Sequence, residues 1–272
     1  MRKSLVILIV LITACNHFSY AIPDHDLNIV YRMSHRLAEE RSSLNEDIMF
    51  LDINGNQSFF YCDKFERNKD VVDSLLRCGY NAFEAREEIV RRNLHGSTMR
   101  TGVFKNYPEA GRITVTEQIL DAFLYEEEMP RLAWVPEESD TIVAGYVCYK
   151  ATAEYRGRTW IAYYTLDITV GDGPWKLCGL PGLILYARDT KGDFVFDCIG
   201  IRQGTVRPIA LRKQKYTKCT AKEMQELRLL DFKDPDELMA RLWGKRPIQT
   251  LDAQGRPVKT VSSTACLLEY LP

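Results

Sequence analysis

Alternating apolar and polar positions predict β-strands near the start of the chain. In residues 27–33 every second side chain is apolar, which places one set of side chains on a single face of a pleated segment. The apolar runs 48–53 and 58–61 flank Asn54-Gly55-Asn56, and Asn-Gly between two such runs is the strongest short signal of a β-hairpin. We therefore expect strands through residues 27–61.

Residues 68–93 have a different period. Apolar residues recur there at intervals of three, four and seven, which predicts one or two amphipathic helices on the sheet, broken at Gly79. Near the C-terminus, Thr220-Ala221-Lys222-Glu223 is a capping box that opens a further helix. Asp234-Pro235 places an N-cap before a proline at the first helical position, and the helix it opens should stop at Gly244.

Between these helical regions the chain returns to strand patterns. Residues 142–155 and 159–165 are strand-like and are joined at Arg156-Gly157. A two-residue turn there would set Tyr149 opposite Tyr164 and would also set Ala153 opposite Trp160. Such cross-strand aromatic pairs stabilise a hairpin by roughly 0.2–1 kcal/mol each.

A second hairpin is predicted from residues 183–187 and 194–201 around Lys191-Gly192. The many strands and the near absence of alternating strand–helix–strand units indicate a mainly β (α+β) fold. We predict a curved antiparallel sheet of about eight to eleven strands, with packed helices at 68–93 and near the C-terminus. A half-barrel like those of periplasmic lipoprotein carriers is the favoured architecture, by analogy alone. No repeat or long linker divides residues 22–272, which we take as a single domain.

The first residues have the three parts of a secretory signal peptide. Arg2 and Lys3 are followed by an apolar stretch over 5–14 and by small residues at Ser19 and Ala21, before a predicted cut. A second interpretation of the segment stays open, because Ile12-Thr13-Ala14-Cys15 resembles a lipobox whose cysteine is acylated. Either way we expect an exported protein, in the periplasm or associated with the outer membrane. Its membrane contact would be limited to a lipid anchor at Cys15.

Charge and residue types exclude some classes of function. A cut after Ala21 leaves 251 residues, with 34 Lys and Arg against 37 Asp and Glu, and this near balance argues against nucleic-acid binding. The basic run 212–215 and the acidic cluster 126–128 are therefore interpreted as solvated faces, in preference to a polyanion site and a calcium site. The chain holds only four His and no C-x-x-C spacing, so we predict no metal and no cofactor.

Eight cysteines in an exported chain favour disulfides. Seven remain once Cys15 is removed or acylated, so at least one thiol should stay unpaired or pair between chains. We predict a short crosslink between Cys62, at a strand end, and Cys78, on the following helix. Its closed loop would contribute about 3 kcal/mol. Cys219 with Cys266 is a weaker candidate.

Known catalytic patterns are absent from the sequence, which has no G-x-S-x-G, H-E-x-x-H or Walker motif. The most unusual stretch is 173–185, where two prolines and three glycines separate apolar residues. Such a stretch predicts a tightly shaped loop that delivers the chain into a central strand. A structural role for the loop and a ligand site both remain open.

Within that stretch, Gly179-Leu180-Pro181-Gly182-Leu183-Ile184 spells the signature of the GLPGLI family, exported proteins of Bacteroidetes. The resemblance spans roughly residues 45–205 and includes Gly145 to Ala151 and Trp160 to Thr165. It departs from the family at Ile168-Thr169 and Leu177-Cys178. The resemblance implies a location in a Gram-negative envelope and no particular reaction, since the family has no established biochemical activity.

We predict a non-enzymatic ligand-binding or accessory protein for an apolar or peptide ligand, or for an outer-membrane protein partner. The alternative is an envelope hydrolase or transferase with Cys148 as the nucleophile, which leaves the catalytic residues unknown. We expect the Arg156–Arg158 turn and the 171–182 loop to meet at one rim of the sheet. Both arginines would be exposed there for a carboxylate or phosphate, unless they merely solvate a hairpin tip. The candidate ligand-binding residues are Cys148, Arg156, Arg158, Trp160, Tyr163, Pro174, Trp175, Gly179, Leu180, Pro181 and Gly182.

Overall fold

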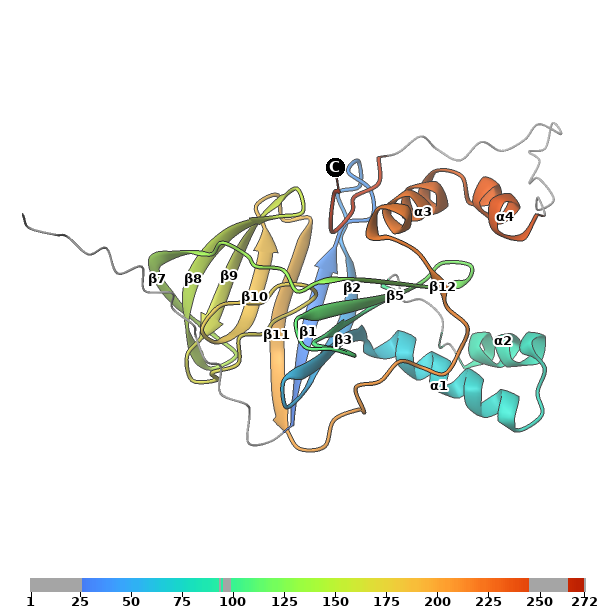
Figure 1. Cartoon of the computed structure of the whole chain (residues 1–272), viewed down its shortest axis with the longest axis horizontal. Helices are drawn as coiled ribbons and strands as arrows, with labels where there is room; N and C mark the ends of the chain where they lie inside the picture. Colours follow the sequence, from blue (N-terminus) through green and yellow to red (C-terminus); the bar gives the residue numbers. More distant parts are fainter. Residues whose placement is uncertain (1–25, 93, 95–98, 245–263, 272) are drawn as a thin grey trace, which may run out of the picture.

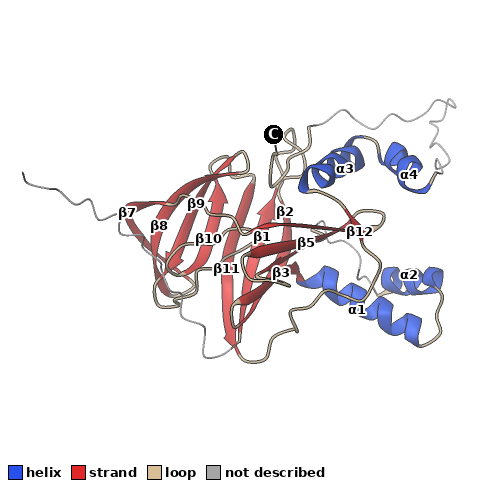
Figure 2. Ribbon diagram, viewed as in Figure 1, coloured by secondary structure: helices blue, strands red, loops and turns tan. Residues whose placement is uncertain are grey.

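A single sheet of twelve strands forms the body of the molecule, as seen in a computed structural model (Figures 1 and 2). The structure describes residues 26–92, 94, 99–244 and 264–271. The predicted signal peptide and Cys15 lie outside these residues. All neighbouring strands are antiparallel except β12 and β6, so the predicted fold class is confirmed. The strands are β1 (Leu27–His35), β2 (Asn45–Asn54), β3 (Gln57–Cys62), β4 (Thr101–Lys105), β5 (Arg112–Gln118), β6 (Ala122–Glu128), β7 (Val135–Val143), β8 (Tyr146–Tyr155), β9 (Arg158–Thr165), β10 (Leu183–Asp189), β11 (Phe194–Gln203) and β12 (Thr217–Lys218).

The sheet is strongly curved, and its topology requires the curvature. Its strands run in the order β12-β6-β5-β4-β3-β2-β1-β11-β10-β9-β8-β7, so β6 and β7 lie near opposite edges although they are consecutive in sequence. Residues 129–134, which join them, span at most about 25 Å. The ten strand spacings between β6 and β7 would cover about 48 Å in a flat sheet. The sheet therefore curls until one short segment crosses its open side (Figure 1).

Four helices lie beside the sheet, and the sequence signals for them are confirmed. They are α1 (Asp63–Arg77), α2 (Ala82–Arg91), α3 (Ala221–Lys233) and α4 (Pro235–Trp243). Gly79, with φ of +92°, separates α1 from α2. The capping box at Thr220 opens α3, and Asp234 caps α4, which ends at the left-handed Gly244.

The predicted hairpins form, and the one at Arg156-Gly157 has the expected register. Tyr149 faces Tyr164 and Ala153 faces Trp160 across the turn at Arg156-Gly157. Both turn residues have positive φ, +52° and +75°, which matches the right-handed twist of the two strands. One turn was missed: the run 142–155 is two strands, because Ala144 and Gly145 adopt positive φ between β7 and β8.

No disulfide forms between the described cysteines, so the two predicted crosslinks are absent. Cys62 and Cys78 cap opposite ends of α1, and the helical rise separates them by about 24 Å. A disulfide requires Cα atoms less than about 7 Å apart. The thiols of Cys219 and Cys266 instead contact the Leu124 carbonyl and the Arg158 guanidinium.

Apolar side chains fill the interior of the curve, from β1 and β2 through β9 to β11. Trp160, Tyr31, Tyr125 and Phe60 are among its largest fully buried members. In the described part of the chain, no helix combines the length and apolar character that crossing a membrane requires.

Candidate functional site

The connection between β9 and β10 passes through the interior of the curved sheet. Trp175 and Lys176 in this connection are 2% and 0% exposed. The Lys105 ammonium on β4 bonds the Asp172 carboxylate and the Gly173 carbonyl. These bonds connect the β9–β10 connection to β4, which lies on the other side of β1 in the sheet. At Gly182 a Cβ atom would lie 1.8 Å from the Thr165 carbonyl oxygen, so only glycine fits that position.

A second segment, residues 264–271, lies at one end of the curved sheet, close to α3 (Figure 1). Apart from one isolated bridge between Ala38 and Ala265, it has no regular secondary structure. Its backbone is held by the Cys266 N–H donating to the Leu37 carbonyl and the Tyr270 N–H donating to the Arg156 carbonyl. A chain in this setting resembles a bound peptide more than an element of the fold.

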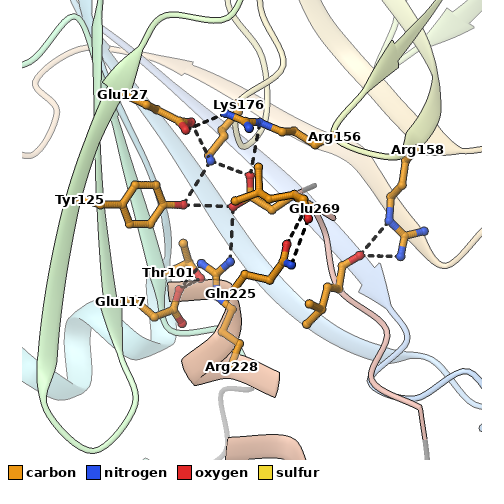
Figure 3. A network of polar contacts seen from close by, with 12 residues as sticks. Thr101, Glu117, Tyr125, Glu127, Arg156, Arg158, Lys176, Gln225, Arg228 and Glu269 are labelled. Carbon is orange, nitrogen blue, oxygen red and sulfur yellow. Dashed lines mark hydrogen bonds and ion pairs between the residues drawn. The ribbon is translucent and has the colours of Figure 1, made fainter. Parts of the chain in front are cut away.

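Glu269 of this segment enters a buried cluster of charges (Figure 3). The Lys176 ammonium lies 2.8 Å from the Glu269 carboxylate and 2.7 Å from that of Glu127. The Tyr125 hydroxyl donates to Glu269 at 3.0 Å, and Lys176 donates to the same hydroxyl at 3.1 Å. Glu269 is 1% exposed, so this ion pair is shielded from solvent.

Arg228 of α3 extends the cluster toward β4 and β5. Its guanidinium lies 3.4 Å from the Glu269 carboxylate and 2.7 Å from that of Glu117. The Thr101 hydroxyl donates to the same carboxylate oxygen of Glu117. Burial alone would raise the pKa of Glu269, but Lys176 and Arg228 outweigh burial and hold that pKa below its usual range. The Glu269 carboxylate is thus charged at neutral pH.

Arg158 of β9 forms a second buried anchor for residues 264–271. Its Nε and Nη2 donate to the Leu267 carbonyl at 2.8 and 2.5 Å. Its Nη1 lies 2.6 Å from the Asp189 carboxylate and 3.2 Å from that of Asp193. The guanidinium also packs over the ring of Tyr270, 5.3 Å from its centroid.

A cavity of about 440 Å³ opens beside these anchors. Its walls come from the end of β1, from β4 and β5, from α3 and from residues 265–268. Apolar walls are supplied by Ile119, Trp175, Phe194, Phe232 and Leu268, and cationic side chains by Arg36, Arg100 and Arg228.

The expectation that both arginines of the turn are exposed donors is wrong. Arg158 is only 6% exposed, because Asp189, Asp193 and a backbone carbonyl occupy its donors. Arg156 is partly buried, and its guanidinium lies 2.9 Å from the Glu127 carboxylate. The alternative of a merely solvated hairpin tip is wrong for the same reason.

The Arg156–Arg158 turn and the 171–182 loop were expected to meet, and they do so only near Trp175 and Lys176, in the middle of the loop. Lys176 shares Glu127 with Arg156, and the ring of Trp175 lies 5.7 Å from that of Tyr155. Gly182, by contrast, contacts Thr165 at the far end of β9.

The other predicted residues are divided between the interior and the opposite face. Trp160 is fully buried, with its ring 5.6 Å from that of Trp175, and its indole N–H has no acceptor among the described residues. Tyr163 packs on Tyr186, away from the cluster. The loop residues Pro174 and Leu180 are buried, whereas Gly179 and Pro181 are exposed and half-buried.

Cys148 lies apart from the charged cluster. It is fully buried on β8, and its thiol contacts the Tyr146 carbonyl. Burial raises the pKa of this thiol to about 11. A nucleophilic cysteine needs the opposite shift, toward a thiolate at neutral pH.

Sequence reasoning missed five residues of the cluster: Glu117, Tyr125, Lys176, Arg228 and Glu269. Glu127 was interpreted as part of a solvated acidic edge, yet it is an ion-pair partner of both Lys176 and Arg156. Arg212, assigned to a solvated basic face, bonds Glu66, Asp70 and Asp73 of α1. The only available signal was a lysine inside an otherwise apolar run, Trp175-Lys176-Leu177. Among the described residues, no group of three His, Cys, Asp or Glu could hold a metal ion.

Comparison with known proteins gives similarity in fold alone. No protein-family model matches the sequence, and no curated protein matches it. Two solved structures of PNGF-II, in space groups P21 and C2, are each 14% identical to this chain, with TM-scores of 0.51 and 0.50. The alignments cover 77% and 75% of this chain but only 34% and 32% of PNGF-II, so the chain spans about a third of that protein's length.

Proposed function

We propose that this protein is an exported envelope protein that binds an apolar or peptide ligand in the interior of its curved sheet. The supporting observation is the cavity of about 440 Å³, which falls within the usual range for ligand sites. Apolar side chains of Ile119, Phe194 and Leu268 supply burial, and the same cavity is lined by Arg36, Arg100 and Arg228 together with Glu117 and Asp231. That combination suits an apolar or peptide ligand that also carries polar groups.

Binding is favoured over catalysis by the state of the candidate nucleophile. With its pKa raised to about 11, the Cys148 thiol is protonated at neutral pH. It also lies outside the residues that line the cavity. A Cys148→Ala variant should therefore keep ligand binding and fold normally. Loss of a measurable turnover in that variant would favour the enzyme instead.

Native mass spectrometry of protein purified from its own envelope tests the proposal directly. We expect a co-purifying ligand on the wild type and on Ile199→Trp, which adds bulk at an exposed position of β11. Ile119→Trp, which adds the same bulk in the cavity, should remove the ligand while circular dichroism shows a folded sheet. Equal ligand occupancy in both variants would exclude this cavity as the site.

The proposed location is the periplasm or the outer membrane, with the GLPGLI resemblance and the N-terminal residues as support. Mass analysis of the mature N-terminus distinguishes the two processing routes. A start after Ala21 gives a soluble form, and an acylated Cys15 gives an anchored one. A mature chain that retains Met1 would contradict export.

A further inference from the structure

Residues 264–271 lie against the body of the protein as a bound peptide would, with Ala265, Cys266 and Glu269 buried. Side chains of the body hold its backbone: Arg158 donates to the Leu267 carbonyl, and Gln225 of α3 bonds both backbone groups of Leu271. The Leu271 N–H donates to the Gln225 side chain at 2.6 Å. Capture of a backbone by fixed side chains is a recurring way of binding extended peptides.

The charged cluster is complete only when a carboxylate enters it. Arg156, Lys176 and Arg228 bring three positive charges, whereas Glu117 and Glu127 supply two negative ones. Glu269 provides the third and balances the cluster. Lys176 is fully buried and keeps Glu127 as a partner, but loss of the Glu269 carboxylate would leave one positive charge of the cluster without a counter-charge in a low-dielectric interior. The site therefore selects for an acidic side chain.

The segment also forms one wall of the cavity. Residues 265–268 line it together with Trp175, Phe194 and Arg228. A peptide in the position of residues 264–271 would thus have both a carboxylate pocket and adjoining apolar space. Arg228 lines the cavity and also bonds Glu269, so the cavity and the charged cluster adjoin each other.

We propose that this site binds an acidic peptide from another chain, with a glutamate preceded by apolar residues, and that residues 264–271 are its intramolecular competitor. The inference rests on the proposed ligand-binding function and names its ligand class. Leu267-Leu268-Glu269-Tyr270 of this chain gives the pattern of the ligand. Binding in trans displaces the segment from Arg158, Gln225 and the charged cluster.

Fluorescence anisotropy with a labelled peptide of sequence 264–271 tests this on the full chain under reducing conditions. Glu269→Gln weakens the internal segment and keeps every receptor side chain. We expect the acidic peptide to bind this variant at least tenfold more tightly than the wild type. A peptide with glutamine in place of Glu269 should lose that gain. Glu226→Gln, at an exposed position of α3, serves as the matched control and should bind like the wild type.

Thermal unfolding keeps the test decisive if Glu269→Gln folds poorly. The acidic peptide should then raise the Tm of the variant, and the glutamine peptide should leave it unchanged. Equal effects of the two peptides, or no effect of either, would overturn the inference. A ligand seen by native mass spectrometry and lost in Ile119→Trp, without any response to the acidic peptide, would overturn this inference alone.

Discussion

The two anchors of residues 264–271 recognise different parts of that segment. Arg158 bonds the Leu267 carbonyl, a backbone group that every residue presents. Lys176 and Tyr125 bond the Glu269 carboxylate, which only an acidic residue provides. Both anchors are buried.

The two anchors therefore have different roles: one fixes the position of a bound segment, and the other determines which sequence is accepted. A backbone anchor fixes where a chain runs and accepts any sequence, whereas a buried charged anchor rejects a chain that leaves it unpaired. Arg158 keeps Asp189 and Asp193 as partners whatever lies beside it. Lys176 and Arg228, by contrast, would share fewer carboxylates without Glu269. Sequence preference should therefore arise at Lys176.

The largest effect is expected from Lys176→Met. The substitution preserves length and apolar volume but leaves the carboxylates of Glu127 and Glu269 without their buried ammonium partner. Breaking a buried pair in this way costs about 3–5 kcal/mol. Urea denaturation of the two proteins measures the change in the free energy of unfolding.

Lys150→Met is the matched control for that substitution. Lys150 pairs with Glu137 at a more exposed site, where solvent screens the pair and leaves it contributing little to stability. A loss at Lys176 no greater than that at Lys150 would contradict the importance given to the buried cluster.

Arg158→Lys should have a smaller effect, because it retains the charge beside Asp189 and Asp193. It loses the planar fork that bonds the Leu267 carbonyl through two nitrogens. We expect a loss of about 1–3 kcal/mol in the free energy of unfolding. The acidic preference in peptide binding should persist, and its disappearance would show that Arg158 also selects.

Local patterns predicted the elements of the fold well. The turn at Arg156-Gly157, the break at Gly79 and the cap at Thr220 each depend on residues adjacent in sequence. The Ala144-Gly145 turn was missed because alanine rarely adopts the positive φ it has there. Apolar residues on both sides therefore looked like one continuous strand.

The site was predicted only in part, because its contacts join distant segments. Trp175 and Arg156 were selected from an unusual loop and a hairpin turn; Arg156 belongs to the cluster and Trp175 lies beside it. Glu269 is 93 residues from Lys176, and no local pattern links them. From residue type alone, such a glutamate is expected on the surface, since a charged residue is rarely buried without a partner.

The pH dependence of stability should distinguish Glu269 from the backbone anchor. Its folded pKa lies below the ordinary value of 4.5, because Lys176 and Arg228 outweigh the effect of burial. The charged carboxylate thus contributes stability above that pH, and the contribution is lost as pH falls through the folded pKa. The limiting slope is about 1.4 kcal/mol per pH unit for one proton.

Comparison of wild type with Glu269→Gln between pH 7 and pH 3 isolates this contribution. The stability difference between the two proteins should shrink on acidification, because glutamine does not titrate. A difference that stays constant would mean that the pKa of Glu269 is the same in the folded and unfolded protein, and would contradict the lowering expected from Lys176 and Arg228.

The smallest effect is expected at Gln225, the remaining backbone contact. Its side chain accepts the Leu271 N–H at 2.6 Å and lies 3.5 Å from the Leu271 carbonyl. Both groups are only partly buried, so water can replace the lost bonds, and Gln225→Ala should cost about 0.5–1.5 kcal/mol. Glu226→Ala on the exposed face of the same helix controls for helix propensity.

If Gln225→Ala reduced the preference for an acidic peptide over its glutamine version, selection would not reside in the charged cluster alone. An unchanged preference, with both peptides bound more tightly, is the result expected of a contact that places the segment without selecting its sequence.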